Sequence, residues 1–110
     1  MFYLALIIIA FYQTASYPQL IYSTNSQHKA DIKVFVVDYA NQADLKVYKV
    51  NHKYEADGNQ GLWYFVDYEF QADKKIHFVK YMYQADLKIY FVKYKYQAGW
   101  NEKSKMHLLY

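Results

Sequence analysis

The strongest constraint on how this chain folds is a unit of thirteen residues, beginning with Ala-Asp, that recurs along most of its length. Successive units begin 13, 13, 16, 13 and 13 residues apart, and the longer interval contains an insertion at 58–61. The units occupy residues 30–42, 43–55, 56–71, 72–84 and 85–97, followed by a variant unit at 98–110 that begins with Ala-Gly. Such an array predicts that each unit forms the same structural element and packs against its copies.

Each unit alternates with a period of two, which predicts a β-strand. In the unit 85–97, Tyr90 and Val92 share one face, while Ile89 and Phe91 begin the other. Valine keeps its position in all five units, as a central core position would. We expect about eight strand residues per unit and about five in each connection, where the aspartate bonds its own backbone as an Asx-turn. Leu20-Ile21-Tyr22 forms a short strand before the array.

Composition favours one compact all-β domain over 17–110. The chain has 110 residues, 55% of them hydrophobic, including fifteen tyrosines and no cysteine. Disulfides are therefore excluded, and burial of aromatic rings must supply much of the stability. The net charge is +3, from thirteen lysines against ten aspartates and glutamates, and the chain has no arginine. Because arginine dominates specific contacts to bases and phosphates, nucleic acid is not an expected partner.

Residues 1–16 differ from the rest of the chain. Residues 1–12 are apolar and carry no charged side chain, and small residues follow at 14–16. The length fits the apolar region of a signal peptide better than a bilayer-spanning helix of roughly twenty residues. We expect a cleaved signal peptide and an exported protein. An uncleaved membrane anchor and an apolar first strand are the alternatives.

The tandem units, with ADLKIYFVKYKYQ at 85–97 as the copy closest to the consensus, resemble a small family of bacterial knotted β-repeat proteins of unknown function. The closing segment AGWNEKSKMHLLY at 98–110 shares this resemblance, which covers about residues 30–110. In that family the backbone forms a deep seven-crossing torus knot, called a septoil knot. The resemblance implies a tightly wound, knotted all-β domain and no catalytic residues. The apolar segment 1–16 and the insertion at 58–61 depart from the family.

The sequence contains no recognisable catalytic or metal-binding motif. His52 and His77 replace tyrosine, which favours aromatic packing over metal binding. The repeated aspartates lack the glycine-rich, multi-carboxylate loops that calcium requires. Asp67 and Glu69 are the one carboxylate pair that suggests acid-base chemistry, but they replace lysines, which favours pairing with a lysine across strands. We expect no enzyme activity, no cofactor and no metal, with an enzyme based on Asp67 and Glu69 as a minor alternative.

The departures from the repeat are the candidate binding residues. Trp63 follows the insertion, and Trp100 precedes the basic tail that contains Lys103 and Lys105. Packing at the ends of the array is one interpretation of the tryptophans, and a stacking platform for a ligand is the other. We expect a structural or partner-binding protein whose partner is an unknown protein or a cell-envelope glycan. A carbohydrate-binding module using Trp63, tyrosines and lysines is the alternative, and pairing of strand edges predicts a homodimer.

Overall fold

The structure is a computed structural model that describes residues 17–110, so the predicted signal peptide at 1–16 lies outside the described residues. Within 17–110 the chain forms seven strands and seven 3-10 helices. The strands are β1 (Leu20–Ser23), β2 (Ile32–Val36), β3 (Leu45–Lys49), β4 (Leu62–Phe65), β5 (Lys74–Phe78), β6 (Leu87–Phe91) and β7 (Gly99–Trp100). The helices are η2 (Gln27–Lys29), η3 (Ala40–Gln42), η4 (Lys53–Glu55), η5 (Glu69–Gln71), η6 (Met82–Gln84), η7 (Lys95–Gln97) and η8 (Lys103–Leu109).

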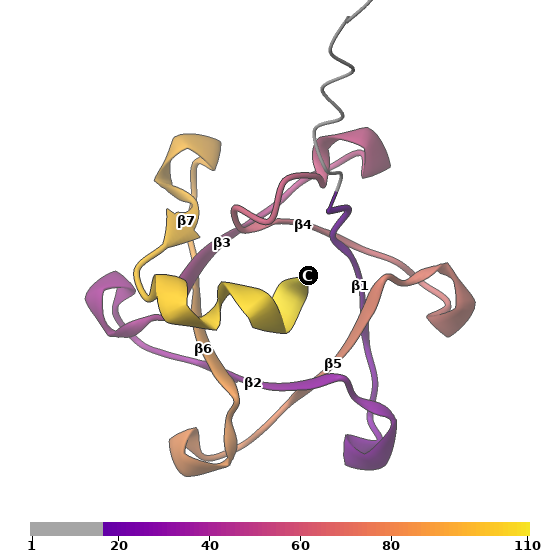
Figure 1. Cartoon of the computed structure of the whole chain (residues 1–110), viewed down its shortest axis with the longest axis horizontal. Coiled ribbons are helices and arrows are strands. Elements are labelled where there is room, and N and C mark those ends of the chain that lie inside the picture. Colours follow the sequence, from indigo (N-terminus) through magenta and orange to yellow (C-terminus); the bar gives the residue numbers. More distant parts are fainter. Residues whose placement is uncertain (1–16) are drawn as a thin grey trace, which may run out of the picture.

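Strands β1 to β6 close into a barrel in the order β4-β1-β5-β2-β6-β3, with β3 pairing back to β4. All six of these pairings are parallel, and β7 adds an antiparallel pairing at the start of β3. Figure 1 shows the ring of strands with the connections projecting outward around it. The expectation of an all-β domain of tandem units, including a strand at 20–22, is confirmed.

The chain passes around the barrel twice. Strands β1, β2 and β3 take alternate places, β5 and β6 lie between them, and β4 closes the ring. Three connections cross the outside of a strand from the other pass: η3 packs on β6, η5 on β1 and η6 on β2. The connection through η4 differs, because it joins the adjacent strands β3 and β4. The connections through η3, η5 and η6 each advance the chain two places around the ring, which explains why the same unit recurs.

The strands are shorter than the eight residues predicted from the alternation. β2, β3, β5 and β6 each have five residues, and a 3-10 helix follows three residues later. In each of three corners the last side chain of the 3-10 helix accepts a hydrogen bond from a backbone N–H three residues earlier. Gln84 accepts from Tyr81 at 3.2 Å, Gln97 from Tyr94 at 3.0 Å, and Glu55 from His52 at 3.2 Å. These side-chain caps end the strand, so residues that continue the strand alternation in the sequence form a corner instead.

The repeated aspartates join strands, so the predicted Asx-turn is wrong. The carboxylate of Asp31 accepts from the Lys75 N–H at 2.8 Å, and Asp31 N–H donates to the Lys75 carbonyl at 2.7 Å. Asp44 makes the same pair of bonds with Lys88. The partners are 44 residues apart in sequence. Asp73 and Asp86 bond in the same way to Leu20 and Lys33, so these four aspartates each extend the parallel ladder by one residue and connect the two passes. Asp57 instead accepts from Tyr17 N–H and from the adjacent Gly58 N–H.

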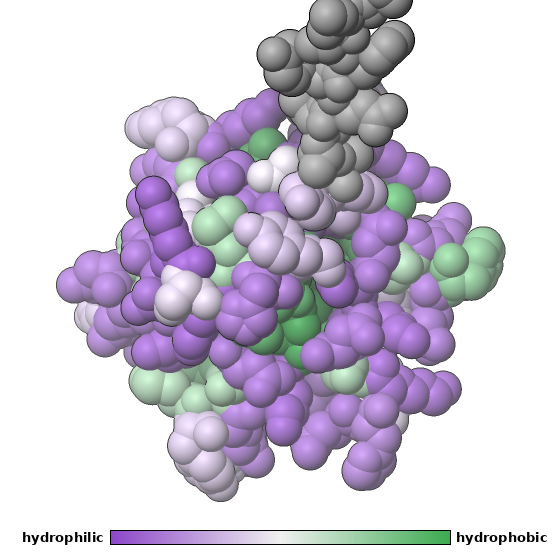
Figure 2. All heavy atoms as spheres, viewed as in Figure 1, coloured by the Kyte–Doolittle hydropathy of each residue, from purple (hydrophilic) through white to green (hydrophobic). Residues whose placement is uncertain are grey.

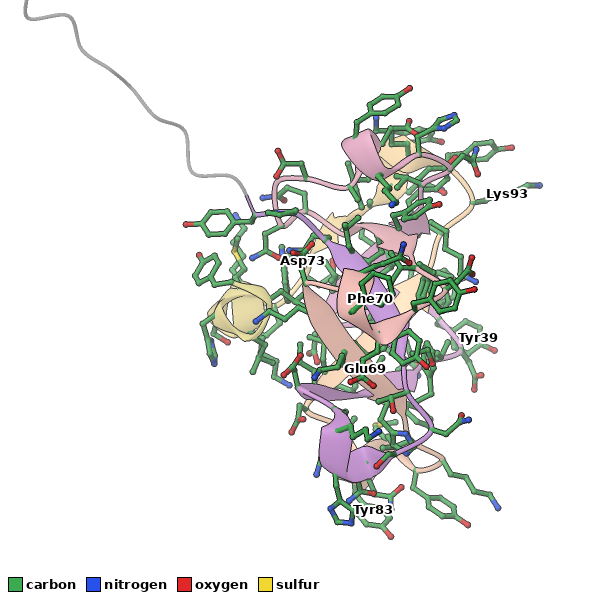
Figure 3. All side chains as sticks on the ribbon, turned by 90° about the vertical axis from the view of Figure 1, so that its right-hand side faces the viewer. Tyr39, Glu69, Phe70, Asp73, Tyr83 and Lys93 are labelled. Atoms are coloured by element: carbon green, nitrogen blue, oxygen red, sulfur yellow. The ribbon has the colours of Figure 1, made fainter. Side chains whose placement is uncertain are left out.

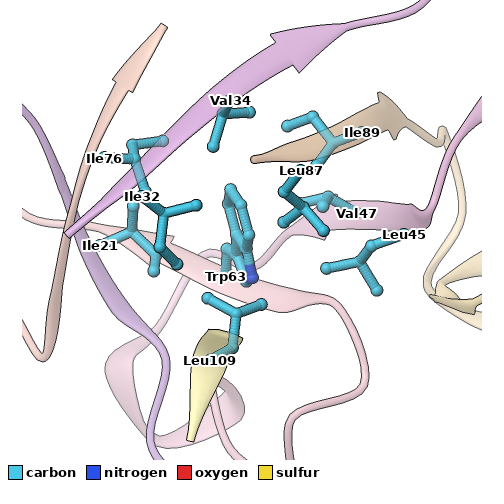
Figure 4. Close-up of a cluster of buried hydrophobic side chains, with 10 residues drawn as sticks. All are labelled: Ile21, Ile32, Val34, Leu45, Val47, Trp63, Ile76, Leu87, Ile89 and Leu109. Carbon is cyan, nitrogen blue, oxygen red and sulfur yellow. The ribbon is translucent and has the colours of Figure 1, made fainter. Parts of the chain in front are cut away.

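The core is built from the third and fifth positions of the units, counted from the alanine, because these side chains point into the barrel. Figure 4 shows Trp63 at its centre, with Leu109 of the C-terminal segment closing one end. The ten core residues are Ile21, Ile32, Val34, Leu45, Val47, Trp63, Ile76, Leu87, Ile89 and Leu109. The repeated valine is not among them. Val37, Val50 and Val66 are buried just after their strands.

A further unit precedes those recognised in the sequence. Thr24 donates its N–H to the Ile76 carbonyl at 2.8 Å, as Val37 does to Ile89. Helix η2 follows it as η3 follows Val37. Residues 17–29 thus repeat the architecture without the Ala-Asp and valine signals, because Pro18 and Thr24 stand at those positions.

The insertion at 58–61 turns the chain back toward β4. The Ala56 carbonyl first accepts from Gln19 N–H, beside the start of β1. The backbone is then left-handed at Gly58 (φ 90°), Asn59 (φ 41°) and Gly61 (φ 86°). A Cβ at Gly61 would collide with the Lys46 backbone oxygen, whereas a Cβ at Gly58 would meet nothing within 4 Å. Gly61 is therefore required both by its left-handed backbone and by the close approach of Lys46, whereas Gly58 is required only by its left-handed backbone.

We predict that Gly61→Ala lowers the free energy of unfolding by about 2–4 kcal/mol, because backbone strain and a steric clash add together. The matched control Gly58→Ala should cost only about 1–2 kcal/mol, since it carries the left-handed strain alone. Urea unfolding followed by tryptophan fluorescence measures both values. Equal losses in the two variants would contradict the close packing of Gly61 against β3.

Candidate functional site

Three of the four candidate binding residues taken from the sequence, Trp63, Trp100 and Lys105, make structural contacts. Trp63 is 0% exposed in the barrel core, so the prediction of a stacking platform there is wrong. Trp100 is half-buried against the core, and its Nε1 donates to the Asn59 carbonyl at 2.8 Å, which holds the insertion in place. Both tryptophans lie beside departures from the repeat, as the sequence indicated, but their indole rings pack within the protein.

The basic tail closes one end of the barrel. Lys105 Nζ lies 3.1 Å from the Asp44 carboxylate and 3.3 Å from the Asp86 carbonyl, while Lys103 is exposed. The Gln19 side chain donates to the Leu109 carbonyl at 3.2 Å inside the barrel. Figure 2 shows that this face is mostly hydrophilic, with apolar atoms near its centre. Lys105 therefore anchors η8.

The other groups considered for chemistry have local structural contacts. Glu69 lies 3.9 Å from Lys75 Nζ, and Asp67 is exposed. His52 stacks on Tyr54 with ring centroids 5.4 Å apart, and His77 Nδ1 lies 2.9 Å from the Thr24 carbonyl. Among residues 17–110, no three His, Asp or Glu side chains cluster closely enough to hold a metal ion.

Four corners each hold a pair of stacked aromatic rings in solvent. In the corner of η7, Tyr94 and Tyr96 have centroids 5.9 Å apart and an interplanar angle of 12°. The Tyr96 side chain is 83% exposed. The other pairs are His52–Tyr54, Tyr68–Phe70 and Tyr81–Tyr83. Each pair leaves apolar ring surface in solvent, where contact with another molecule would bury it.

A groove of about 530 Å³ opens on the outer wall between corners η3 and η7. Its lining carries two ammonium groups and two phenols, and no carboxylate. The lining residues are Ala40, Lys46, Tyr90, Val92, Lys93, Tyr96 and Gln97. Lys46 and Tyr90 are register partners between β3 and β6, so both side chains stand on the outer face of the barrel.

The first residue of η3 keeps this groove open. Ala40 occupies that position, where five other corners carry longer side chains: Gln27, Lys53, Glu69, Met82 and Lys95. The short side chain at position 40 is visible in the sequence, but its effect on the groove can be inferred only when η3 is known to lie over β6. Sequence reasoning therefore missed the groove.

The end of the barrel opposite η8 has no comparable plug within the described chain. The seventh position of each unit points inward there, and we call these six residues the barrel mouth: Ser23, Val36, Lys49, Phe65, Phe78 and Phe91. Phe65 and Phe91 come from strands on either side of β3, yet their centroids are 6.4 Å apart. Lys49 Nζ lies 4.6 Å from the Phe91 centroid and 5.4 Å from that of Phe65.

The mouth leaves apolar surface in solvent. Val36 is 40% exposed and Phe78 is 37% exposed. In Figure 3, η8 and Asp73 lie toward one end of the barrel, and Tyr39 and Lys93 lie toward the other. The mouth and the outer groove are thus two adjoining candidate surfaces, and Lys93 lies where they meet.

The fold is that of a closed parallel β-barrel wound from tandem units of thirteen residues. The chain belongs to the family of the 7(1) septoil knot domain, whose profile matches residues 18–101. This confirms the family resemblance and extends it to the unit at 17–29. No curated protein and no solved structure matches the chain. In the described part of the chain, no helix has the length and apolar character to cross a membrane.

Proposed function

We propose that this protein is an exported, non-enzymatic scaffold whose knotted backbone makes it kinetically stable and which binds a partner through its outer wall. The observation that carries the binding role is the set of stacked aromatic pairs held in solvent at four corners. Solvent-exposed rings gain from contact with a partner, since each ring buries a large apolar area. Export rests on the apolar segment 1–12.

The winding of the chain supports the knot. Two passes interleave around one axis, and the connections through η3, η5 and η6 cross outside a strand of the other pass. A torus knot is a curve of this form, wound repeatedly around a closed ring. The family description names a 7(1) knot over residues 18–101. A knotted chain must withdraw an end through several loops before it unfolds, which slows unfolding.

A covalent ring made from the native protein tests the knot directly. Tyr17 and Tyr110 have ring centroids 5.0 Å apart, and the chain has no cysteine. Tyr17→Cys/Tyr110→Cys joined by a short thiol crosslinker closes the domain into a ring. We expect the natively closed ring, once denatured, to migrate as a more compact species than the same variant closed after long denaturation. Equal hydrodynamic radii for the two rings would contradict the knot.

Kinetic stability is tested by proteolysis of the native full-length chain. The thirteen basic residues are all lysines, so trypsin has sites throughout the units. We expect residues 17–110 to persist for hours under conditions that digest the urea-unfolded protein within minutes. Rapid cleavage inside residues 43–98 while the protein remains folded would contradict kinetic stability and leave the binding role untouched.

A second candidate function, binding of an acidic saccharide, is favoured by the outer groove. The ring of Tyr96 offers an apolar face to sugar C–H groups, while Lys46 and Lys93 would pair with a carboxylate. Tyr90 brings a hydroxyl to the same lining. This proposal keeps the glycan ligand predicted from the sequence but moves it from the buried Trp63 to the groove between η3 and η7.

Closing the groove tests this candidate. Ala40→Met places at this corner the residue that Met82 supplies in another unit, so the fold should accept it. We expect tetragalacturonate to bind the native protein and Ala40→Met to weaken that binding at least tenfold in calorimetry, with Gln27→Met in a different corner as the matched control. Absence of tetragalacturonate binding, or equal binding by both variants, would contradict the saccharide site.

A further inference from the structure

We propose that the barrel mouth is a docking surface for a second copy of this chain, so that two barrels pack end to end about a twofold axis. The mouth brings four apolar side chains to one end of the barrel: Val36, Phe65, Phe78 and Phe91. Two of these are more than a third exposed. In contrast, Leu109 closes the other end of the same barrel and is 1% exposed. The mouth is therefore the end at which contact buries further apolar area.

The charges on the rim around the mouth favour a second copy of the chain as the partner. The ninth position of each unit lies just past the strand end, and all six residues there are exposed. These rim residues are Asn25, Asp38, Asn51, Asp67, Lys80 and Lys93. Two aspartates and two lysines give the rim zero net charge with both signs present. A strongly acidic or basic partner would meet like charges, whereas a copy of the same rim offers both signs.

The strand order permits self-complementary packing. Two barrels that face each other about a twofold axis read the ring β4-β1-β5-β2-β6-β3 in opposite directions. An axis between β4 and β1 places Lys49 opposite the partner's Phe78 and Asp38 opposite the partner's Lys93. An axis between β5 and β2 places Lys49 opposite the partner's Phe65 and Asp38 opposite the partner's Lys80. In both arrangements Asp38 meets a lysine and the two Lys49 ammonium groups do not meet.

Lys49 prepares the mouth for this contact. Its ammonium group already lies over the rings of Phe65 and Phe91, where a cation–π interaction replaces part of its hydration. A third ring from the partner would extend this aromatic environment around the ammonium group. Because mouth and rim together form a small surface, we expect a weak dimer with a dissociation constant of about 10–100 µM.

Sedimentation velocity on the full chain tests the dimer. Phe78→Lys installs the side chain that Lys49 supplies at the same position of another unit, so the fold should accept it. We expect the native protein to dimerise and Phe78→Lys to weaken the dimer at least tenfold. Tyr110→Lys, which also replaces an exposed ring by lysine but lies at the opposite end of the barrel, should leave it unchanged. Circular dichroism checks that both variants fold.

A charge exchange tests the pairing across the rim. Asp38→Lys and the double variant Lys80→Asp/Lys93→Asp should each lose self-association, because like charges then meet at the rim. A mixture of the two should form a heterodimer at least as tight as the native dimer, since every contact is again between opposite charges. A native protein that stays monomeric at about 500 µM, a Phe78→Lys protein that dimerises normally, or a mixture that stays monomeric would overturn the proposal.

Discussion

Parallel pairing between the two passes of the chain is the interaction on which the rest of the structure depends. Apart from the pairing of β3 with β4, every pairing in the barrel joins distant parts of the sequence, as when Lys75 and Asp31 exchange two hydrogen bonds across 44 residues. A strand of the first pass therefore has no complete set of backbone partners until the second pass is in place. Local strand propensity alone cannot stabilise such a structure, so the hydrogen bonds between distant strands must do so.

The length of the unit follows from that ladder. A strand of five residues rises about 16 Å, and the next strand of the same pass lies two places, or about 10 Å, away. The connection must return along the barrel and move sideways over an intervening strand, and an eight-residue segment such as 37–44 reaches about 26 Å when extended. A much shorter unit could not cross the intervening strand. The short reach of the connection explains why the thirteen-residue spacing is kept and why the corner is a single 3-10 turn.

Sequence reasoning recovered what is local and repeated. The period-two alternation gave the strands, and the Ala-Asp spacing gave the units. It missed what depends on a neighbour far along the chain. The carboxylate of Asp44 looks suited to its own turn until Lys88 is known to lie beside it. The tyrosines at corner positions continue the alternation perfectly, although glutamine caps have already ended the strand.

The candidate surfaces were hidden for the same reason. Ala40 is an ordinary alanine in the sequence and opens a groove only because η3 lies across β6. Phe65, Lys49 and Phe91 come from three different units and converge only when the barrel closes. The two tryptophans, in contrast, were candidates because their side chains are large. In the structure these side chains fill space, Trp63 in the core and Trp100 against the insertion.

A repeat that must satisfy a fixed ladder leaves few positions free to vary. The inward third and fifth positions fill the core, and the second position and the corner glutamine complete the hydrogen bonding. Freedom remains at the seventh and ninth positions around the mouth and at the eleventh and twelfth positions in the corners. The units differ at these positions in charge and size, from Val36 to Lys49 and from Ala40 to Lys95. Binding specificity in such a barrel therefore belongs to the mouth and the corners, because changes there leave the ladder intact.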